Sequence, residues 1–393
     1  MDNAATSFPK PPGVLEAMTR YATDLGASAG RGAYAEALAT GDLLSSCRAN
    51  LNKLIHGESP EHVIFTLNCS DALNLAIKGM IDPRPTAGGG QHVVCTEVDH
   101  NSILRPVEAL AADHVVERTY VPASGDGLVD PDDVRRAIRS DTKLVCITHA
   151  SNVTGAVQKV REIGAICREA AVPFVVDAAQ SIGHVPLDVQ RDNIDLLAAP
   201  GHKALMGPLG TGFLYLRPGL ERMLRPLREG GTGSQSDEPV QPATMPDKYE
   251  PGSHNAIGLA GLNAGVEWLL NRGVEGVGGV AEYEASLVRT FIGATVGLEN
   301  FTYHGPQGIA DRIGVFSVAI PDHAPQELSA ILESSYGILT RSGIHCAPFV
   351  HKSLGTVPNG GTTRLSFGPF LTPQDVKYAA DALAELAMEA VPA

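Results

Sequence analysis

Two residues in the middle of the chain have the types and positions needed to hold a reactive aldehyde. Asp177 ends the apolar run 173–176, and Lys203 closely follows another apolar run, 196–200. A lysine at the end of a buried strand loses hydration and tends toward the neutral amine, which adds to a carbonyl. An aspartate on a neighbouring strand can keep a pyridine nitrogen protonated, so that the ring withdraws electrons. The pair indicates pyridoxal 5′-phosphate as a cofactor, and the alternative is a surface lysine with an aspartate that caps a helix.

A predicted helix start supplies a second feature of such a site. The run Phe65-Thr66-Leu67 leads through Asn68 into a helix that we expect to begin at Cys69 or Ser70. The free amides of a helix N-terminus bind anions, so a cofactor phosphate could lie there against the hydroxyl of Ser70. The alternative is an ordinary helix capped by Ser70 or Asn68.

Two more polar residues follow predicted strands. His100 comes after the run 92–97, where an imidazole could stack on a flat ring and carry a proton. The alternative for His100 is an exposed loop histidine. Gln180 lies just beyond Asp177 and could donate a hydrogen bond to a ring oxygen.

The elements that must position these residues follow a regular alternation. Strand-like runs occur at 92–97, 144–149, 174–177 and 212–216, and helix-period segments at 131–139 and 160–170. Asp130 is placed to cap the first of these helices, and Pro131 suits its first position. The alternation predicts an α/β protein with a mostly parallel sheet covered by helices. Ligands of such sheets bind at the carboxyl ends of strands, where Asp177 and Lys203 are expected.

The pattern changes in the C-terminal third. An amphipathic helix is predicted from 255 to 271, and the elements beyond it are fewer and more separated. We therefore expect a large cofactor-binding domain at 14–258 and a smaller α/β domain made of 1–13 and 259–393. The Gly/Pro/Ser-rich stretch 230–246 is predicted to be a surface excursion of the large domain.

Charge and cysteine usage exclude several classes of protein. The 393 residues include 44 Asp and Glu against 30 Lys and Arg, a formal charge of −14 without a basic cluster, which argues against a nucleic-acid partner. The sequence shows no signal peptide and no membrane span, so we expect no membrane association and a cytoplasmic location. The six cysteines form no Cys-x-x-Cys pair, so neither a metal site nor a disulfide framework is expected. Cys95 and Cys146 lie in apolar runs and are expected to be buried.

Seven segments, in order along almost the whole chain, resemble motifs of the class V, fold-type I pyridoxal-phosphate enzymes, in the group of cysteine desulfurases and selenocysteine lyases. The segments are Asp2-Asn3-Ala4-Ala5-Thr6, Asp99-His100-Asn101, 151–155, Gly201-His202-Lys203, 250–255, 341–349 and Thr363-Arg364-Leu365-Ser366. The resemblance implies the fold of that group, with a large domain and a smaller C-terminal α/β domain that carries the cysteine loop and the carboxylate-binding arginine.

The resemblance also implies a set of cofactor contacts. Lys203 would bind the cofactor aldehyde and Asp177 its ring nitrogen. The remaining contacts within one subunit would come from His100, Gln180, Cys69, Ser70, His202 and Asn152. Gly252 and Ser253 would reach the cofactor phosphate of the neighbouring subunit, so the resemblance implies a homodimer.

The same resemblance implies how a substrate would be handled. Arg364 would bind the carboxylate of L-cysteine bidentately with help from Asn152, while Lys203 moves the α-proton and His100 assists in proton transfer. Cys346 would take the substrate sulfur as a persulfide, leaving L-alanine. The short segment between Cys346 and Arg364 is similar to the branch that hands sulfur to a dedicated acceptor protein.

Departures from the family pattern leave alternatives open. Asn68-Cys69-Ser70-Asp71 stands where many relatives have Gly-Thr-Thr-Glu, Ile344 stands where many have a second histidine, and Pro348 follows Ala347 directly. Selenocysteine lyase activity would use the same residues. Another C–S lyase, or a class V transferase or epimerase of a biosynthetic pathway, would not need Cys346. A non-catalytic scaffold would lack part of the cofactor set, which is complete here.

Overall fold

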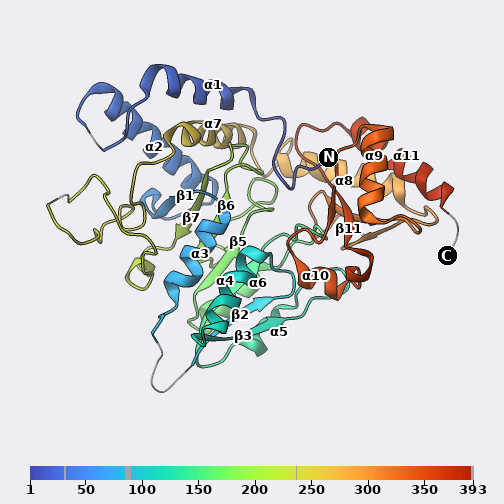
Figure 1. The fold of residues 1–393 in the computed structure, drawn as a ribbon, viewed down its shortest axis with the longest axis horizontal. Coiled ribbons are helices and arrows are strands. Elements are labelled where there is room, and N and C mark those ends of the chain that lie inside the picture. The colour runs from blue at the N-terminus through green and yellow to red at the C-terminus, as the bar shows by residue number, and fades with distance from the viewer. Residues whose placement is uncertain (31, 85–89, 236, 391–393) are drawn as a thin grey trace.

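The computed structural model describes residues 1–30, 32–84, 90–235 and 237–390. Within them lie a seven-stranded sheet in the order β1-β7-β6-β5-β4-β2-β3 and a four-stranded sheet in the order β10-β11-β9-β8. The two sheets occupy different ends of the molecule, and the first lies near α2 and α3 while the second lies near α9 and α11 (Figure 1). The predicted α/β fold, with a mostly parallel large sheet and a smaller α/β layer, is confirmed.

The large sheet is parallel from β3 through β6 and antiparallel at its other edge. Its strands, in sheet order, are β1 (Val63–Thr66), β7 (Gly212–Leu216), β6 (Leu196–Pro200), β5 (Phe174–Asp177), β4 (Thr142–Thr148), β2 (Gln91–Thr96) and β3 (Val116–Val121). Most central strands are buried along their whole length because helices cover both faces, which explains their nearly continuous apolar sequence. The strand residues alternate between two hydrophobic clusters, one on each face.

The two faces are covered by different helices. One cluster contains residues of α3 (Cys69–Met80) and α4 (Asn101–Ala112). The other contains residues of α2 (Ala35–Leu54), α5 (Pro131–Ala137), α6 (Val160–Glu169) and α7 (Ala256–Arg272). On its outer side α7 also packs against α1 (Pro12–Arg20). Short 3₁₀ or π turns complete this part at Tyr21–Leu25, Pro60–His62 and Leu220–Arg222.

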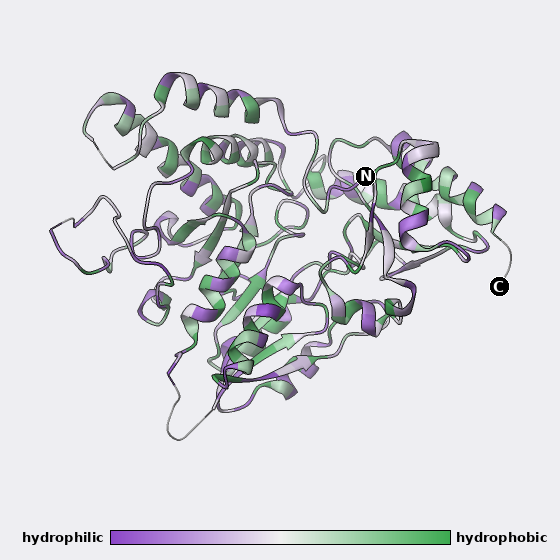
Figure 2. Ribbon diagram, viewed as in Figure 1, coloured by the Kyte–Doolittle hydropathy of each residue, from purple (hydrophilic) through white to green (hydrophobic). Residues whose placement is uncertain are grey.

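The small sheet is antiparallel throughout. It consists of β8 (Thr302–His304), β9 (Val315–Ala319), β10 (Arg341–Gly343) and β11 (Thr362–Ser366), with helices α8 (Val280–Thr295), α9 (Pro325–Tyr336) and α11 (Pro373–Glu389). Phe291, Phe316 and Phe367 pack ring against ring in its core. The helices around both sheets are hydrophobic where they face inward and hydrophilic outside (Figure 2). The loop after β10 leads into α10 (Pro348–Ser353) and a 3₁₀ turn at Val357–Asn359.

The first seven residues connect the two sheets. Asp2 pairs with Ser366 of β11, and the backbone amide of Ala4 donates to the hydroxyl of Ser366. In the other direction, the hydroxyl of Ser7 donates to the carbonyl of Lys203 at 2.7 Å. The N-terminal segment therefore ties the small sheet to the loop that carries the candidate cofactor lysine.

Most predicted elements are confirmed with small shifts at their ends. The runs 174–177 and 212–216 are β5 and β7, and Asp130 caps α5 by accepting from the amide of Asp132. The amphipathic character expected of the helix at 255–271 is wrong for α7, which is buried on most of its surface because it lies between the large sheet and α1 and α2. Among the described residues, no helix is long and apolar enough to cross a bilayer, and no three His, Cys, Asp or Glu side chains form a metal-binding group.

Candidate active site

A cavity of about 120 Å³ opens where the parallel strands β2, β4, β5 and β6 end. The side chains around it come from the strand ends, from the starts of α3 and α4, and from the loop after β6. They are Asn68, Cys69, Ser70, His100, Ser102, Thr148, Asn152, Asp177, Ala179, Gln180, Pro200, His202 and Lys203. Eight of the sequence-predicted cofactor residues therefore lie around one cavity.

Lys203 lies three residues beyond the end of β6, in a turn closed by a hydrogen bond from the amide of Gly201 to the carbonyl of Thr211. Burial lowers the pKa of the Lys203 ammonium below its ordinary value, and the nearby carboxylate of Asp177 acts in the opposite direction. The net shift favours the neutral amine, the form that bonds to an aldehyde.

Asp177 is the last residue of β5 and is 2% exposed. Its Oδ1 accepts from the backbone amide of Ala179 at 2.9 Å and from the thiol of Cys69 at 3.4 Å. Burial, together with this carboxylate, raises the pKa of the Cys69 thiol well above its ordinary value, so Cys69 remains a neutral donor. The two contacts fix the orientation of the carboxylate that is expected to face a pyridine nitrogen.

His100 caps the start of α4, since its Nδ1 accepts from the backbone amide of Ser102 at 3.1 Å. Nδ1 is therefore unprotonated, and the ring proton is on Nε2. Burial lowers the pKa of His100 to about 4, with the charge of Asp177 opposing the shift. The ring is neutral near pH 7 and presents one N–H donor.

The strand ends around His100 are joined by a buried carboxylate. Asp99 is fully buried and accepts from the backbone amides of Thr96 at 2.7 Å and Thr148 at 2.6 Å. These bonds hold the ends of β2 and β4 together directly beneath the cavity. Burial raises the pKa of the Asp99 carboxyl to about 7, although both amide bonds favour its ionised form.

The start of α3 forms the anion-binding end of the cavity. Asn68 caps the helix by accepting from the amide of Asp71, as one of the sequence alternatives predicts, and the hydroxyl of Ser70 lies 2.6 Å from that of Ser102 at the start of α4. The starts of two helices thus meet here, where α3 supplies the free amides of Cys69 and Ser70 and the two helices supply one hydroxyl each, whereas the first amides of α4 are bonded to Cys346 and His100. Such an arrangement suits a phosphate group.

Three predicted cofactor residues have polar groups that differ in whether they are hydrogen-bonded within the protein, and this shows how well a cofactor fits. The side-chain amide of Gln180 donates to the carbonyl of Ala4 at 2.9 Å, which uses one of its two N–H groups. Within the described chain, Nδ1 of His202 and Oδ1 of Asn152 are buried and have no hydrogen-bond partner. Unsatisfied polar atoms on a cavity wall are expected where a polar ligand binds. Together with the amine, carboxylate and helix starts, they fit pyridoxal 5′-phosphate.

Arg364 lies behind this cavity, on β11, and is 1% exposed. Its Nη2 donates to Oδ1 of Asp2 at 2.7 Å, and its Nη1 donates to the carbonyl of Asn152 at 3.2 Å. Nε of Arg364 is buried without a partner in the described chain. Arg364 does not line the cavity itself, so Asn152 is the residue that joins the two.

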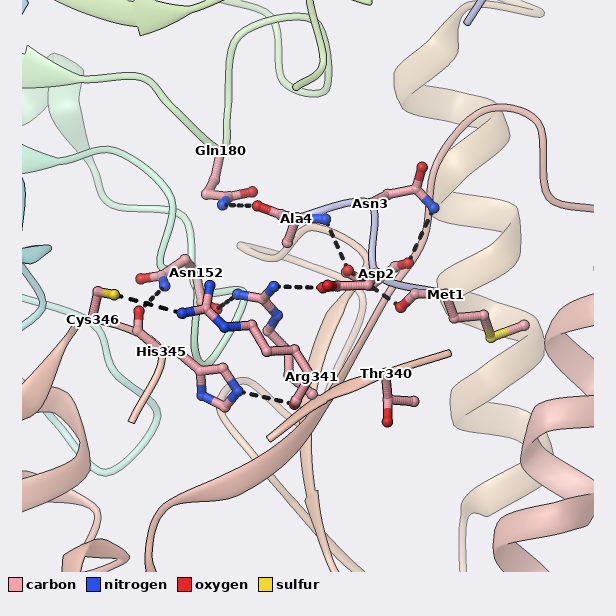
Figure 3. Close-up of polar contacts among 12 residues, drawn as sticks. Met1, Asp2, Asn3, Ala4, Asn152, Gln180, Thr340, Arg341, His345 and Cys346 are labelled. Carbon is pink, nitrogen blue, oxygen red and sulfur yellow. Dashed lines mark hydrogen bonds and ion pairs between the residues drawn. The ribbon is translucent and has the colours of Figure 1, made fainter. Parts of the chain in front are cut away.

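Cys346 is exposed on the loop between β10 and α10. Its sulfur lies 3.6 Å from Nη2 of Arg341, and Arg341 is paired across the strands with Arg364. Figure 3 shows Asp2, Asn152 and Cys346 gathered near Arg341. Two like charges directly opposite each other in a sheet repel, so this surface is suited to anions.

Gly252 and Ser253 do not join the other predicted cofactor residues. Both are exposed and line a second cavity with Thr66, Leu67, Gly210 and Arg228. Their loop is anchored by Glu250, whose carboxylate accepts from Arg48 at 2.7 and 2.9 Å and from the backbone amide of Phe65 at 2.6 Å. Gly252 and Ser253 therefore lie apart from the cavity that contains Lys203.

Some residues of the site were not predicted from the sequence. The pairing of Asp2 with Arg364 joins residues 362 positions apart, and no local pattern signals it. Ser102 and Thr148 line the cavity without having been singled out. Both follow or end predicted strands, so the rule that ligands lie at carboxyl ends of strands could have found them.

Comparison with known proteins agrees with this geometry. Residues 1–379 match the family described as aminotransferase class-V. A probable cysteine desulfurase of Methanothermobacter thermautotrophicus is 34% identical over 387 residues, 98% of this chain and 94% of the relative. One from Pyrococcus abyssi is 32% identical over 390 residues, 98% of this chain and 93% of the relative. The apo structure of a cysteine desulfurase from Thermococcus onnurineus matches with a TM-score of 0.90 and 31% identity, over 99% of this chain and 94% of the other.

Proposed function

The chain belongs to the aminotransferase class-V family, and from this membership we propose that it is a pyridoxal 5′-phosphate-dependent cysteine desulfurase. It converts L-cysteine to L-alanine and passes the sulfur through Cys346 to an acceptor. The fold is that of the fold-type I enzymes, in agreement with the structural likeness to a cysteine desulfurase at 31% identity.

Different residues of the cavity would hold different parts of the cofactor. Lys203 would bind its aldehyde, Asp177 its ring nitrogen, and the start of α3 with Ser70 its phosphate. His100 lies against the ring, while Gln180, Cys69, His202 and Asn152 complete the wall. When bound, the cofactor withdraws electrons from the α-carbon of the substrate. The amine of Lys203 would move the α-proton, and the Nε2–H of the neutral His100 ring would donate a hydrogen bond at the cofactor site.

The substrate end of the site lies at Asn152. Arg364 and Asn152 hold the α-carboxylate, which directs the side-chain sulfur toward the Cys346 loop. The thiolate of Cys346 attacks that sulfur, so an S–S bond forms on Cys346 while the C–S bond of the substrate breaks. The electron pair stays on the substrate carbon, which takes a proton and leaves as L-alanine. An acceptor thiol then removes the outer sulfur and regenerates Cys346.

Further parts of the proposal concern assembly. Gly252 and Ser253 on their exposed loop reach the cofactor phosphate of a second copy, so the active unit is a homodimer.

Residues 14–258 form the large domain, and 1–13 with 259–393 the small one; α7 spans this boundary and packs against α1 and α2. The six cysteines all lie in the described chain as free thiols, which supports a reducing compartment such as the cytoplasm.

A second candidate activity rests on a specific observation. Neither Cys346 nor Arg364 lines the cavity that contains Lys203. A C–S lyase, or a class V transferase or epimerase, would use Lys203, Asp177 and Arg364 without Cys346. Selenocysteine lyase activity would need the same residues as desulfuration, with selenium in place of sulfur.

The observation that carries the proposal is the hydrogen bond at 2.6 Å between the Asn152 amide, on the cavity wall, and the carbonyl of His345, next to Cys346. The test is to incubate the cofactor-loaded protein with L-cysteine without reductant and to measure alanine together with the mass of the Cys346 peptide. Added sulfur on Cys346 with alanine released supports the desulfurase. Release of sulfide, pyruvate and ammonia with an unmodified Cys346 supports the lyase instead.

A further inference from the structure

The residue before Cys346 is a buried histidine held on three sides. His345 is 2% exposed; its Nε2 lies 3.1 Å from the carbonyl oxygen of Arg341, and its Nδ1 lies 3.3 Å from Nε2 of His351. The carbonyl of His345 accepts from Asn152 at 2.6 Å. Cys346 therefore follows a residue whose ring and backbone are both fixed.

These contacts determine where the ring protons lie. A carbonyl oxygen only accepts, so Nε2 of His345 carries the proton and its Nδ1 must accept from Nε2–H of His351. Nδ1 of His351 is then left to accept from the hydroxyl of Thr356, 2.8 Å away. His351 is 0% exposed and Thr356 6% exposed, and the two imidazole rings are stacked with centroids 5.4 Å apart. The hydrogen bonds therefore run in one direction, from Thr356 through the rings of His351 and His345 to the carbonyl of Arg341 on β10.

The backbone at Cys346 explains why such a chain is needed. His345 and Cys346 both have left-handed conformations, with φ of +53° and +59°. Side chains other than glycine rarely occupy this region, and two in succession persist only where the surroundings impose them. Cys346 itself is exposed, so its side chain supplies little packing to impose that geometry. Its carbonyl is held by the amide of Asn101 at 2.8 Å.

We propose that His351 is a positioning residue for sulfur transfer, which fixes the ring of His345 and thereby holds Cys346 in its left-handed conformation with the sulfur beside the guanidinium of Arg341. Thr356 is the first member of the same chain, because its hydroxyl selects the tautomer of His351. The role in transfer rests on the proposed function, whereas the effect on the conformation of the loop does not.

The test compares His351→Phe with His351→Gln in the cofactor-loaded protein. Phenylalanine keeps the volume and removes both hydrogen bonds, while glutamine restores a donor toward His345. For His351→Phe we expect hydrogen exchange of the backbone amides at 344–356 to accelerate about tenfold, because their opening becomes easier. We expect kcat for alanine to fall between about tenfold and a hundredfold, the effect of misplacing a reacting group. KM for L-cysteine should stay unchanged, since His351 does not line the cofactor cavity.

The matched control is His92→Phe. His92 is also 0% exposed and bonds two threonine hydroxyls, at 2.8 and 2.9 Å, but at the opposite end of the large sheet. This variant should lower the free energy of unfolding. Backbone hydrogen exchange at 344–356, kcat and KM should stay as in the wild type. If hydrogen exchange at 344–356 and kcat return to wild-type values in His351→Gln, the proposed hydrogen-bond chain is supported. If His351→Phe does not fold, Thr356→Val gives the same test, because it removes only the donor to His351.

The proposal is overturned if the variant that folds shows wild-type exchange at 344–356, or if His92→Phe produces the same loss of kcat. A wild-type protein that leaves Cys346 unmodified by L-cysteine would instead contradict the proposed function. Faster exchange in His351→Phe would then still support the role in loop conformation, so the two failures are distinguishable.

Discussion

Oδ1 of Asp2 lies 2.7 Å from Nη2 of Arg364, so a carboxylate from the start of the chain is paired with the arginine that is expected to bind the substrate carboxylate. Arg364 is 1% exposed on its side chain and Asp2 28%, so the pair is shielded on one side only. Burial lowers the pKa of Arg364 and the charge of Asp2 opposes that shift. We interpret Asp2 as the residue that keeps a buried guanidinium charged and oriented.

Replacing Asp2 with Asn should therefore weaken substrate binding. The amide retains an acceptor but removes the charge, which leaves Arg364 and Arg341 facing each other. We expect KM for L-cysteine to rise about tenfold, equivalent to about 1.4 kcal/mol, with kcat less affected. Steady-state kinetics check this, with the exposed Asp24→Asn as control. A lower KM would contradict the interpretation and would show instead that Asp2 competes with the substrate.

Lys203 is expected to be the residue that holds the cofactor covalently. In Lys203→Ala, borohydride should no longer fix the cofactor to the protein, and turnover should be lost because no amine remains to move the α-proton. Mass spectrometry of the reduced protein measures the adduct, and the exposed Lys53→Ala should label like wild type. A labelled Lys203→Ala protein would show that another amine is used.

Stability should fall in acid because buried histidines are neutral in the folded protein. Burial lowers the pKa of His351 to about 4, and burial with the charge of Arg364 lowers that of His345 to about 3. An unfolded histidine has a pKa near 6.5, so this stabilisation is complete above about pH 6.5 and is lost as the pH falls toward 4. The raised pKa of Asp99, about 7, gives the opposite slope over part of this range.

Comparing wild type with His351→Gln isolates the histidine contribution, since Asp99 is the same in both. Urea unfolding at about pH 7, 5.5 and 4.5 should show a smaller loss of unfolding free energy in the variant. Equal losses in the two proteins would mean that His351 does not titrate differently in the folded and unfolded states.

The pair Arg48 and Glu250 should be important for stability and for the loop at 250–255. Their side chains are 11% and 4% exposed, and the ion pair is 2.7 Å long. Replacing Glu250 with Ala leaves a buried guanidinium unpaired, which typically costs about 3–5 kcal/mol. Denaturation should report that loss, and sedimentation should report weaker dimerisation if Gly252 and Ser253 serve a second subunit. The exposed Glu61→Ala is the control, and a similar change in both variants would argue against a specific role.

Local sequence patterns predicted the large sheet and the positions of Asp177 and Lys203 at one edge of it, whereas most of the other site residues were predicted from the family resemblance. Asp177 and Lys203 follow apolar runs that became β5 and β6, and parallel strands bring their ends to one edge of the sheet. Contacts across long separations in sequence could not be predicted. Gln180 bonds to Ala4, and Asp2 to Arg364, because the N-terminal segment crosses between the sheets. His351 was not singled out either, since a histidine in a short helix has no pattern that reveals its partners.

The central claim is that sulfur passes through Cys346, and its most direct test is the fate of sulfur in Cys346→Ala. The account predicts that wild type acquires one added sulfur on the Cys346 peptide and releases alanine, and that the variant binds cofactor but releases alanine at least about a hundredfold more slowly. Alanine released by Cys346→Ala at the wild-type rate would contradict the persulfide route. The sulfur would then have to pass to a thiol other than Cys346.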